Sequence, residues 1–252
     1  MLHLIIAISF VISEPIFEKE NIFVPNEKHN HGSSIVETPE GNLLAVWFHG
    51  SGERNSDDVM LQGARKKIGT NQWCEPFLMA DTPDLPDCNP VLFIDPRNVL
   101  WLFWITVQDN QWGGSLLKYR LSTDYENNVP PVWKWQDVIH ARPLNLEQKF
   151  LEVIEKGQPA IDLLATIEPK LKEEIEFAKK AAQTKLSQRL GWMTRIHPIM
   201  VTEKRMMLGL YSDVFNCSLA AFTEDWGEHW FFSNPILDME IKNISNIQPS
   251  FV

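Results

Sequence analysis

The chain has 252 residues, 44% of them hydrophobic, and a formal net charge of −10. That apolar content excludes a globally disordered chain, because it is enough to build a packed core. The acidic balance argues against nucleic acid as a partner, since phosphates require clustered Lys and Arg.

The N-terminus carries an almost wholly apolar run from Leu4 to Ile12, followed by Ser13. The run is too short to span a bilayer. It fits the apolar region of a secretory signal peptide, although no Lys or Arg precedes it. We therefore expect residues 1–13 to be a signal peptide and the protein to be secreted or periplasmic. A buried first strand is the alternative.

Residues 14–252 read as one β domain built from repeats. Each repeat has the order strand, polar turn, strand, loop, strand, turn and Trp, and the repeats cover residues 32–76, 89–135 and 197–235. The second strand of each is strongly apolar, at Leu43–Phe48, Val99–Ile105 and Met206–Tyr211. Units of about 40–50 residues with this order are typical of four-stranded propeller blades. A β-sandwich is the alternative, but the repeated turn and Trp favour a propeller.

A segment of different composition, residues 145–190, separates the second and third repeats. It is rich in Glu, Lys, Leu and Ala, which predicts helix. We expect a first helix over Leu146–Lys156 that stops at Gly157-Gln158-Pro159, and a second from Pro169 to just before Gly191. The two helices would form a hairpin on the propeller rim. A lid over a site, or a surface for a partner, is the alternative.

One turn carries a recognisable motif. Residues 223–230, Thr-Glu-Asp-Trp-Gly-Glu-His-Trp, have the form Ser/Thr-x-Asp-x-Gly-x-x-Trp. In this pattern, which begins at Thr223, Asp225 caps a tight turn, Gly227 supplies a positive φ, and Trp230 packs between blades. Decayed copies lie at residues 122–133 and 67–73, which are the corresponding places of the other two repeats.

This motif is the Asp box of sialidase-type propellers. Further similar stretches occur at His31–Glu37, Ala45–Phe48, Asn89–Phe93 and Ile247–Ser250. Together they resemble the BNR-repeat sialidase-like family of secreted bacterial proteins. The resemblance covers nearly the whole chain except the leader and the helical segment.

The resemblance implies a mainly β, six-bladed propeller of which about three to four blades are present, since the β part has roughly 175 residues. It also implies an exo-glycosidase that hydrolyses a terminal sugar, such as sialic acid, from glycans. The nucleophilic Tyr of the family and its Glu lie in later blades, so the chain is expected to be an N-terminal fragment with part of the site.

The resemblance also assigns candidate site residues. Family members hold a substrate carboxylate with arginines, whose planar fork pairs with it, and use an Asp as general acid and base. In the loop at residues 53–58, Glu53 and Arg54 are the substrate-binding candidates, and Asp58, or else Asp57, is the acid. A solvated charged turn is the alternative.

Two later positions are weaker candidates. Arg195 precedes the first strand of the third repeat, and Gln248 has the same place in an incipient fourth repeat. Both positions would face the propeller centre and could contact substrate. For Arg195 a salt-bridged structural role is the alternative.

The chain departs from the family at the start of the first repeat. His31-Gly32-Ser33 stands where sialidases have an Arg, which puts sialic acid specificity in doubt and makes His31 a ligand-contacting candidate. His29 and His31 alone are too few for a metal site, so we expect no metal and no cofactor. A carbohydrate-binding propeller without catalysis, or a partner-docking protein, is the alternative function.

Overall fold

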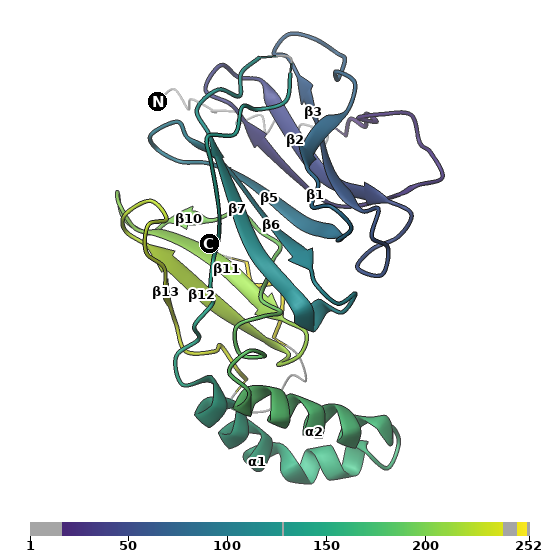
Figure 1. Cartoon of the computed structure of the whole chain (residues 1–252), viewed down its shortest axis with the longest axis vertical. Coiled ribbons are helices and arrows are strands. Elements are labelled where there is room, and N and C mark those ends of the chain that lie inside the picture. The colour runs from purple at the N-terminus through teal and green to yellow at the C-terminus, as the bar shows by residue number, and fades with distance from the viewer. Residues whose placement is uncertain (1–16, 128, 239–245, 251–252) are drawn as a thin grey trace, which may run out of the picture.

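The computed structural model describes residues 17–127, 129–238 and 246–250 of the chain. The predicted signal peptide at residues 1–13 lies outside the described residues. The described part folds into three antiparallel sheets, one for each repeat, which confirms the predicted mainly β architecture (Figure 1).

Each sheet is a meander in which strands follow one another in chain order. The first sheet contains β1 (His29–Glu37), β2 (Leu43–Gly50), β3 (Met60–Lys66) and β4 (Phe77–Ala80). The second contains β5 (Asp87–Ile94), β6 (Leu100–Val107), β7 (Ser115–Ser122) and β8 (Trp135–Val138), with a short 3-10 helix at Trp112–Gly114. The third contains β10 (Ile199–Met200), β11 (Met206–Ser212), β12 (Cys217–Thr223) and β13 (Phe231–Phe232), while β9 (Met193–Thr194) also pairs with β11.

The first strands of the three sheets lie together at the centre. β1 packs beside β5, and β9 packs beside β5 and β6. Side chains link them directly, because Ser34 Oγ accepts a hydrogen bond from Leu92 N at 3.0 Å and His197 Nδ1 donates to Leu92 O at 2.7 Å. The sheets are therefore arranged as blades about a shared inner edge, as the repeat pattern predicts.

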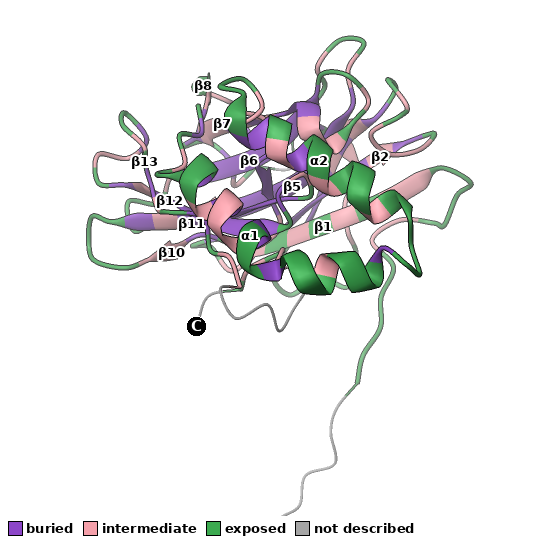
Figure 2. Cartoon of the chain, turned by 90° about the horizontal axis from the view of Figure 1, so that it is seen from below, coloured by how far each residue is buried: buried purple, intermediate pink, exposed green. Residues whose placement is uncertain are grey.

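The second strands form the core of each blade. All eight residues of β6 are buried, and most of β2 and β11 is buried too (Figure 2). A strand covered on both faces must be apolar along its whole length, which is why these segments are continuous hydrophobic runs in the sequence.

The Asp-box turn follows β12 of the third blade and packs against the second blade. Thr223 Oγ1 accepts a hydrogen bond from Gly227 N at 2.8 Å, and Asp225 Oδ1 accepts one from His229 N at 2.9 Å. Gly227 has φ of +95°. Trp230 then packs edge-on against Phe103 of the second blade, with ring centroids 6.3 Å apart. The turn thus joins two blades rather than contacting the loops described below.

The helical segment forms a hairpin at one end of the second and third blades (Figure 1). The prediction that the first helix stops at residues 157–159 is wrong, because α1 runs over Leu146–Leu164 with Pro159 inside it. An internal Pro costs about 3 kcal/mol. The apolar face nevertheless continues from Phe150 and Ile154 to Ile161, and the packing of α1 against the second helix outweighs that cost.

The second helix, α2, covers Lys170–Gln183, with Pro169 as its N-cap. It ends earlier than predicted, because Thr184 adopts an extended conformation. Leu186 therefore leaves the apolar stripe and is 66% exposed. Phe150 anchors the hairpin by packing against Phe215 of the third blade, with ring centroids 5.5 Å apart. Neither helix of the described ranges combines the length and apolar character needed to cross a bilayer.

Candidate functional site

The loops that follow the second strand of each blade gather on one face of the molecule. They are residues 51–59, 108–114 and 213–216. Asn110 Nδ2 of the second loop donates to Arg54 O at 2.9 Å and to Asp57 Oδ1 at 2.8 Å in the first. The Arg54 guanidinium lies over the Trp112 ring, 5.1 Å from its centroid. The three blades therefore present their loops to a common site.

The inner strand of each blade is irregular near this face. The register of β1 shifts between His31 and Ser34, that of β5 shifts between Cys88 and Val91, and Arg195 lies in the gap between β9 and β10. Gly32 and Asn89 have φ of +62° and +50° at these points. Such bulges turn a side chain out of the ladder, and here they bring His31, Asn89 and Arg195 to one place.

These side chains form a continuous polar network with the first loop. Arg195 Nη2 lies 3.4 Å from His31 Nε2, and Arg195 Nη1 donates to Asn89 Oδ1 at 3.3 Å. His31 Nδ1 lies 3.1 Å from Glu53 Oε1. Arg54 Nη1 is 3.9 Å from the other oxygen of Glu53. The structure thus brings together four of the residues singled out in the sequence.

The partners of His31 identify its tautomer. Arg195 only donates hydrogen bonds, so His31 Nε2 is the acceptor and Nδ1–H donates to Glu53. His29 Nε2 lies 3.3 Å from the same Glu53 oxygen, and the ligand atoms of His29, His31 and Glu53 lie within 4.8 Å of one another. A cation bound by all three would displace the Nδ1 proton of His31 and would lie close to two arginines. Both features disfavour a cation at this cluster.

Asn89 extends the network inward. Its Nδ2 donates to Tyr211 Oη at 3.3 Å, and Thr194 Oγ1 donates to its backbone carbonyl at 2.8 Å. Burial raises the pKa of Tyr211, and the nearby Asp213 carboxylate raises it further. Tyr211 is therefore a neutral hydroxyl that can bind a polar group.

The two acid candidates in the first loop are already engaged. Asp58 accepts hydrogen bonds from Ser51 Oγ at 2.6 Å and Ser51 N at 3.0 Å, and Lys28 Nζ is 3.3 Å away. These contacts lower the pKa of Asp58, and the hydrogen bond from the Ser51 hydroxyl contributes most to that shift. Asp57 accepts from Asn110 instead. Neither carboxylate has a contact with His31 or Arg195 among the described residues.

Gln248 has φ of +54° and precedes Pro249, as Asn89 with φ of +50° precedes Pro90. Residues 246–250 form no strand in the structure, so the prediction of a fourth repeat there rests on the sequence alone. The correspondence shows how Asn89 could have been identified, because both residues stand at the same place before a Pro.

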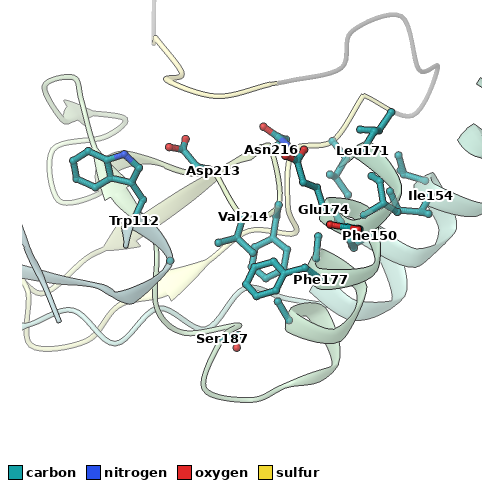
Figure 3. Close-up of a pocket in the computed structure, with 18 of the residues that line it drawn as sticks. Trp112, Phe150, Ile154, Leu171, Glu174, Phe177, Ser187, Asp213, Val214 and Asn216 are labelled. Atoms are coloured by element: carbon teal, nitrogen blue, oxygen red, sulfur yellow. The ribbon is translucent and has the colours of Figure 1, made fainter. Parts of the chain in front are cut away.

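A cavity of about 930 Å³ opens beside the network. Trp112 and Asp213 lie on one side of it, and Ile154, Leu171 and Glu174 of α1 and α2 lie on the other (Figure 3). Arg54 also lines it. Asp213 and Trp112 were missed in the sequence, because no motif marks them and their importance depends on how the blades are placed.

This arrangement can bind a polar, negatively charged group. Arg54 and Arg195 against Glu53 leave a local excess of one positive charge, and arginines pair bidentately with carboxylates. Asn89 and Tyr211 add uncharged hydrogen-bonding groups. Of the network, Arg54 also lines the cavity, as does the carboxyl side chain of Asp213.

Comparisons with known proteins bear on the fold of the chain. Residues 41–250 match the family described as BNR repeat-like domain. A sequence search of curated proteins finds no match.

Solved structures with the same fold include sialidases. A protein of unknown function from Dyadobacter fermentans has a TM-score of 0.54 at 13% identity, covering 85% of this chain and 56% of that one. A leech intramolecular trans-sialidase has a TM-score of 0.53 at 10% identity, with 84% and 45% covered. The NanB sialidase from Streptococcus pneumoniae has a TM-score of 0.53 at 8% identity, with 85% and 46% covered. The chain spans about half the length of these structures. At such identities the likeness establishes the fold alone.

Proposed function

The chain belongs to the BNR repeat-like domain family, and on that basis we propose that it is part of a glycoside hydrolase that removes a terminal acidic sugar from glycans. The observation that carries the proposal is the connected series Arg54, Glu53, His31 and Arg195. It joins the first and third blades at their inner ends, and its member Arg54 also lines the cavity.

The sugar carboxylate is assigned to the two arginines. Arg195 already bonds Asn89 through Nη1, which fixes the guanidinium in place. Glu53 holds Arg54 and orients His31, so it is a positioning residue. His31 replaces the Arg that sialidases have here, so the enzyme would accept a uronic acid or another acidic sugar beside sialic acid.

The proton for the leaving group would come from a carboxyl group of the surrounding loops. The family resemblance assigns Asp58, or else Asp57, to this role. Because the contacts with Ser51 and Lys28 favour the ionised form of Asp58, that residue is not well prepared to donate a proton. The assignment is nevertheless testable by substitution.

The test is release of a fluorophore from a panel of sialosides, uronides and neutral glycosides by the protein in its natural full length. We expect turnover of an acidic member of the panel and none of its methyl ester. Arg195→Ala should reduce the preference for the acid, because Arg54 remains. Equal turnover of the acid and its ester would contradict the proposal, as would no turnover of any glycoside.

A binding protein without catalysis is the second candidate, favoured by the hydrogen bonds that occupy Asp57 and Asp58. In that case an array of glycans would show retention of acidic glycans while the same glycans are recovered uncleaved. Cleavage products on the array would exclude this candidate.

A further inference from the structure

One aspartate of the gathered loops lines the cavity without a hydrogen bond from the described residues. Four aspartates belong to the three gathered loops. Asp58 caps Ser51, Asp57 accepts from Asn110, and Asp109 accepts from Gln111 N at 3.2 Å and lies against Gly114. The Asp213 carboxylate accepts no hydrogen bond from the described residues, and it lines the cavity.

Asp213 is tied to the polar network by its place in the fold. It follows β11 directly and is two residues after Tyr211, whose hydroxyl is bonded by Asn89. Arg54 lines the same cavity and acts on Asp213 electrostatically. Trp112, on which Arg54 lies, faces the same side of the cavity in Figure 3. A sugar whose carboxylate is held by Arg54 would therefore lie beside the cavity that Asp213 also lines.

From this geometry we infer that Asp213 is the proton donor to the leaving group, in place of Asp57 and Asp58. The inference rests on the proposed glycoside hydrolase function and names the acid of that reaction. Asp213 gives its carboxyl proton to the glycosidic oxygen as the bond from that oxygen to the anomeric carbon breaks. The bond's electron pair stays on the oxygen, and the resulting carboxylate later takes a proton from the attacking water.

The environment of Asp213 suits a group that must be protonated before it acts. Partial desolvation in the cavity raises the pKa of Asp213, and the positive charge of Arg54 opposes that rise without cancelling it. Asp58 shows the opposite direction, because its hydrogen bonds stabilise the charged form. A general acid works best when its pKa lies near the working pH, so Asp213 is the better prepared of the two.

The test compares two leaving groups in the protein in its natural full length. For Asp213→Asn we expect kcat/KM on an alkyl glycoside, a poor leaving group, to fall about 10²–10⁴-fold. On an aryl glycoside with an activated leaving group the fall should be less than about tenfold, because that oxygen departs without a proton. The fall of kcat/KM on the alkaline side of the pH profile should also disappear in the variant.

The matched control is Glu174→Gln, which removes another carboxylate from the same cavity on the side of α2. This variant should keep the wild-type ratio between the two substrates. Because the Asp213 carboxylate accepts no hydrogen bond from the described residues, Asp213→Asn should also keep the wild-type melting temperature, which shows that it folds.

Three results separate the possible outcomes. Equal losses on both substrates, or no loss, would overturn the assignment of Asp213 and leave the hydrolase proposal standing. If Asp58→Asn instead showed the selective loss of kcat/KM on the alkyl glycoside, Asp58 of the first loop would be the proton donor. A wild-type protein that turns over neither glycoside would overturn the proposed function and this inference with it.

Discussion

Arg195 Nη2 lies 3.4 Å from His31 Nε2, although the two residues are 164 positions apart in the sequence. One comes from the gap between β9 and β10, and the other from the bulge of β1. Their contact places the first and third blades around one site. It is the relationship on which the assignment of an acid-binding site depends.

Replacing Arg195 should weaken binding of an acidic sugar. A hydrogen bond to a charged group contributes about 1.5–3 kcal/mol, so Arg195→Ala should raise Kd about 10–100-fold. Arg195→Lys should restore only part of that affinity, because Lys lacks the planar fork. Calorimetric titration with the acidic glycan measures both. The control is Arg205→Ala, whose guanidinium Nε bonds Glu224 at 2.6 Å and which should bind like the wild type.

Removing the Asp58 carboxylate should give a stability difference that depends on pH. The pKa of Asp58 is lowered in the folded state, so its contribution is present above the unfolded pKa of about 3.9 and is lost as pH falls through the folded pKa. Asp58→Asn should therefore be less stable than the wild type at pH 7 and equally stable in strong acid. Urea midpoints across this range measure the difference.

Ser51→Ala is the matched variant for Asp58, because it removes the hydroxyl that contributes most to the lowered pKa. It should show a smaller difference with the same pH dependence, since the Ser51 N–H remains. A stability difference that is constant from neutral to acidic pH would contradict the role given to these bonds.

The Asp-box glycine should not tolerate a side chain. Gly227 has φ of +95°, and a Cβ there would lie 3.0 Å from Trp101 of the second blade. The backbone conformation costs an L-residue about 1–2 kcal/mol, and the crowding adds to it. Gly227→Ala should therefore lower the free energy of unfolding by about 2 kcal/mol or more.

Gly69→Ala separates the two causes. Gly69 also has a positive φ, of +73°, but a Cβ there meets nothing within 4 Å. Its substitution should cost only the backbone part, about 1–2 kcal/mol. Equal costs at both positions would show that the contact with Trp101 is unimportant.

The buried Asp87 carboxylate should need both of its oxygens as hydrogen-bond acceptors for stability. It accepts hydrogen bonds from Thr82 N at 2.8 Å, Thr82 Oγ1 at 2.9 Å and Trp104 Nε1 at 2.9 Å. In Asp87→Asn the amide nitrogen must face one of these donors, so a buried group loses its partner at a cost of about 1–3 kcal/mol. Chemical denaturation should show this loss, whereas the exposed Asp137→Asn should change stability by less than about 0.5 kcal/mol.

The sequence alone was sufficient for the blades. The runs Leu43–Phe48, Val99–Ile105 and Met206–Tyr211 became β2, β6 and β11, because a strand buried on both faces has to be apolar throughout. The turn chemistry at residues 223–230 likewise depends on neighbours in the chain. The error at Pro159 has the opposite origin, since the packing between α1 and α2 that keeps the helix continuous is not local.

The residues of the site also separate into those named from the sequence and those found only in the structure. The sequence was enough to name His31, Glu53, Arg54 and Arg195 as candidates, because its resemblance to sialidase-type propellers points to the first loop and to the start of each repeat. Only the tertiary structure decided that Asn89 joins them, that the Asp58 carboxylate is occupied by Ser51, and that Asp213 faces the cavity unbonded. The physical reason is that a hydrogen bond, a desolvated carboxyl or a cavity belongs to atoms brought together from separate blades, and no spacing along one chain records their distance.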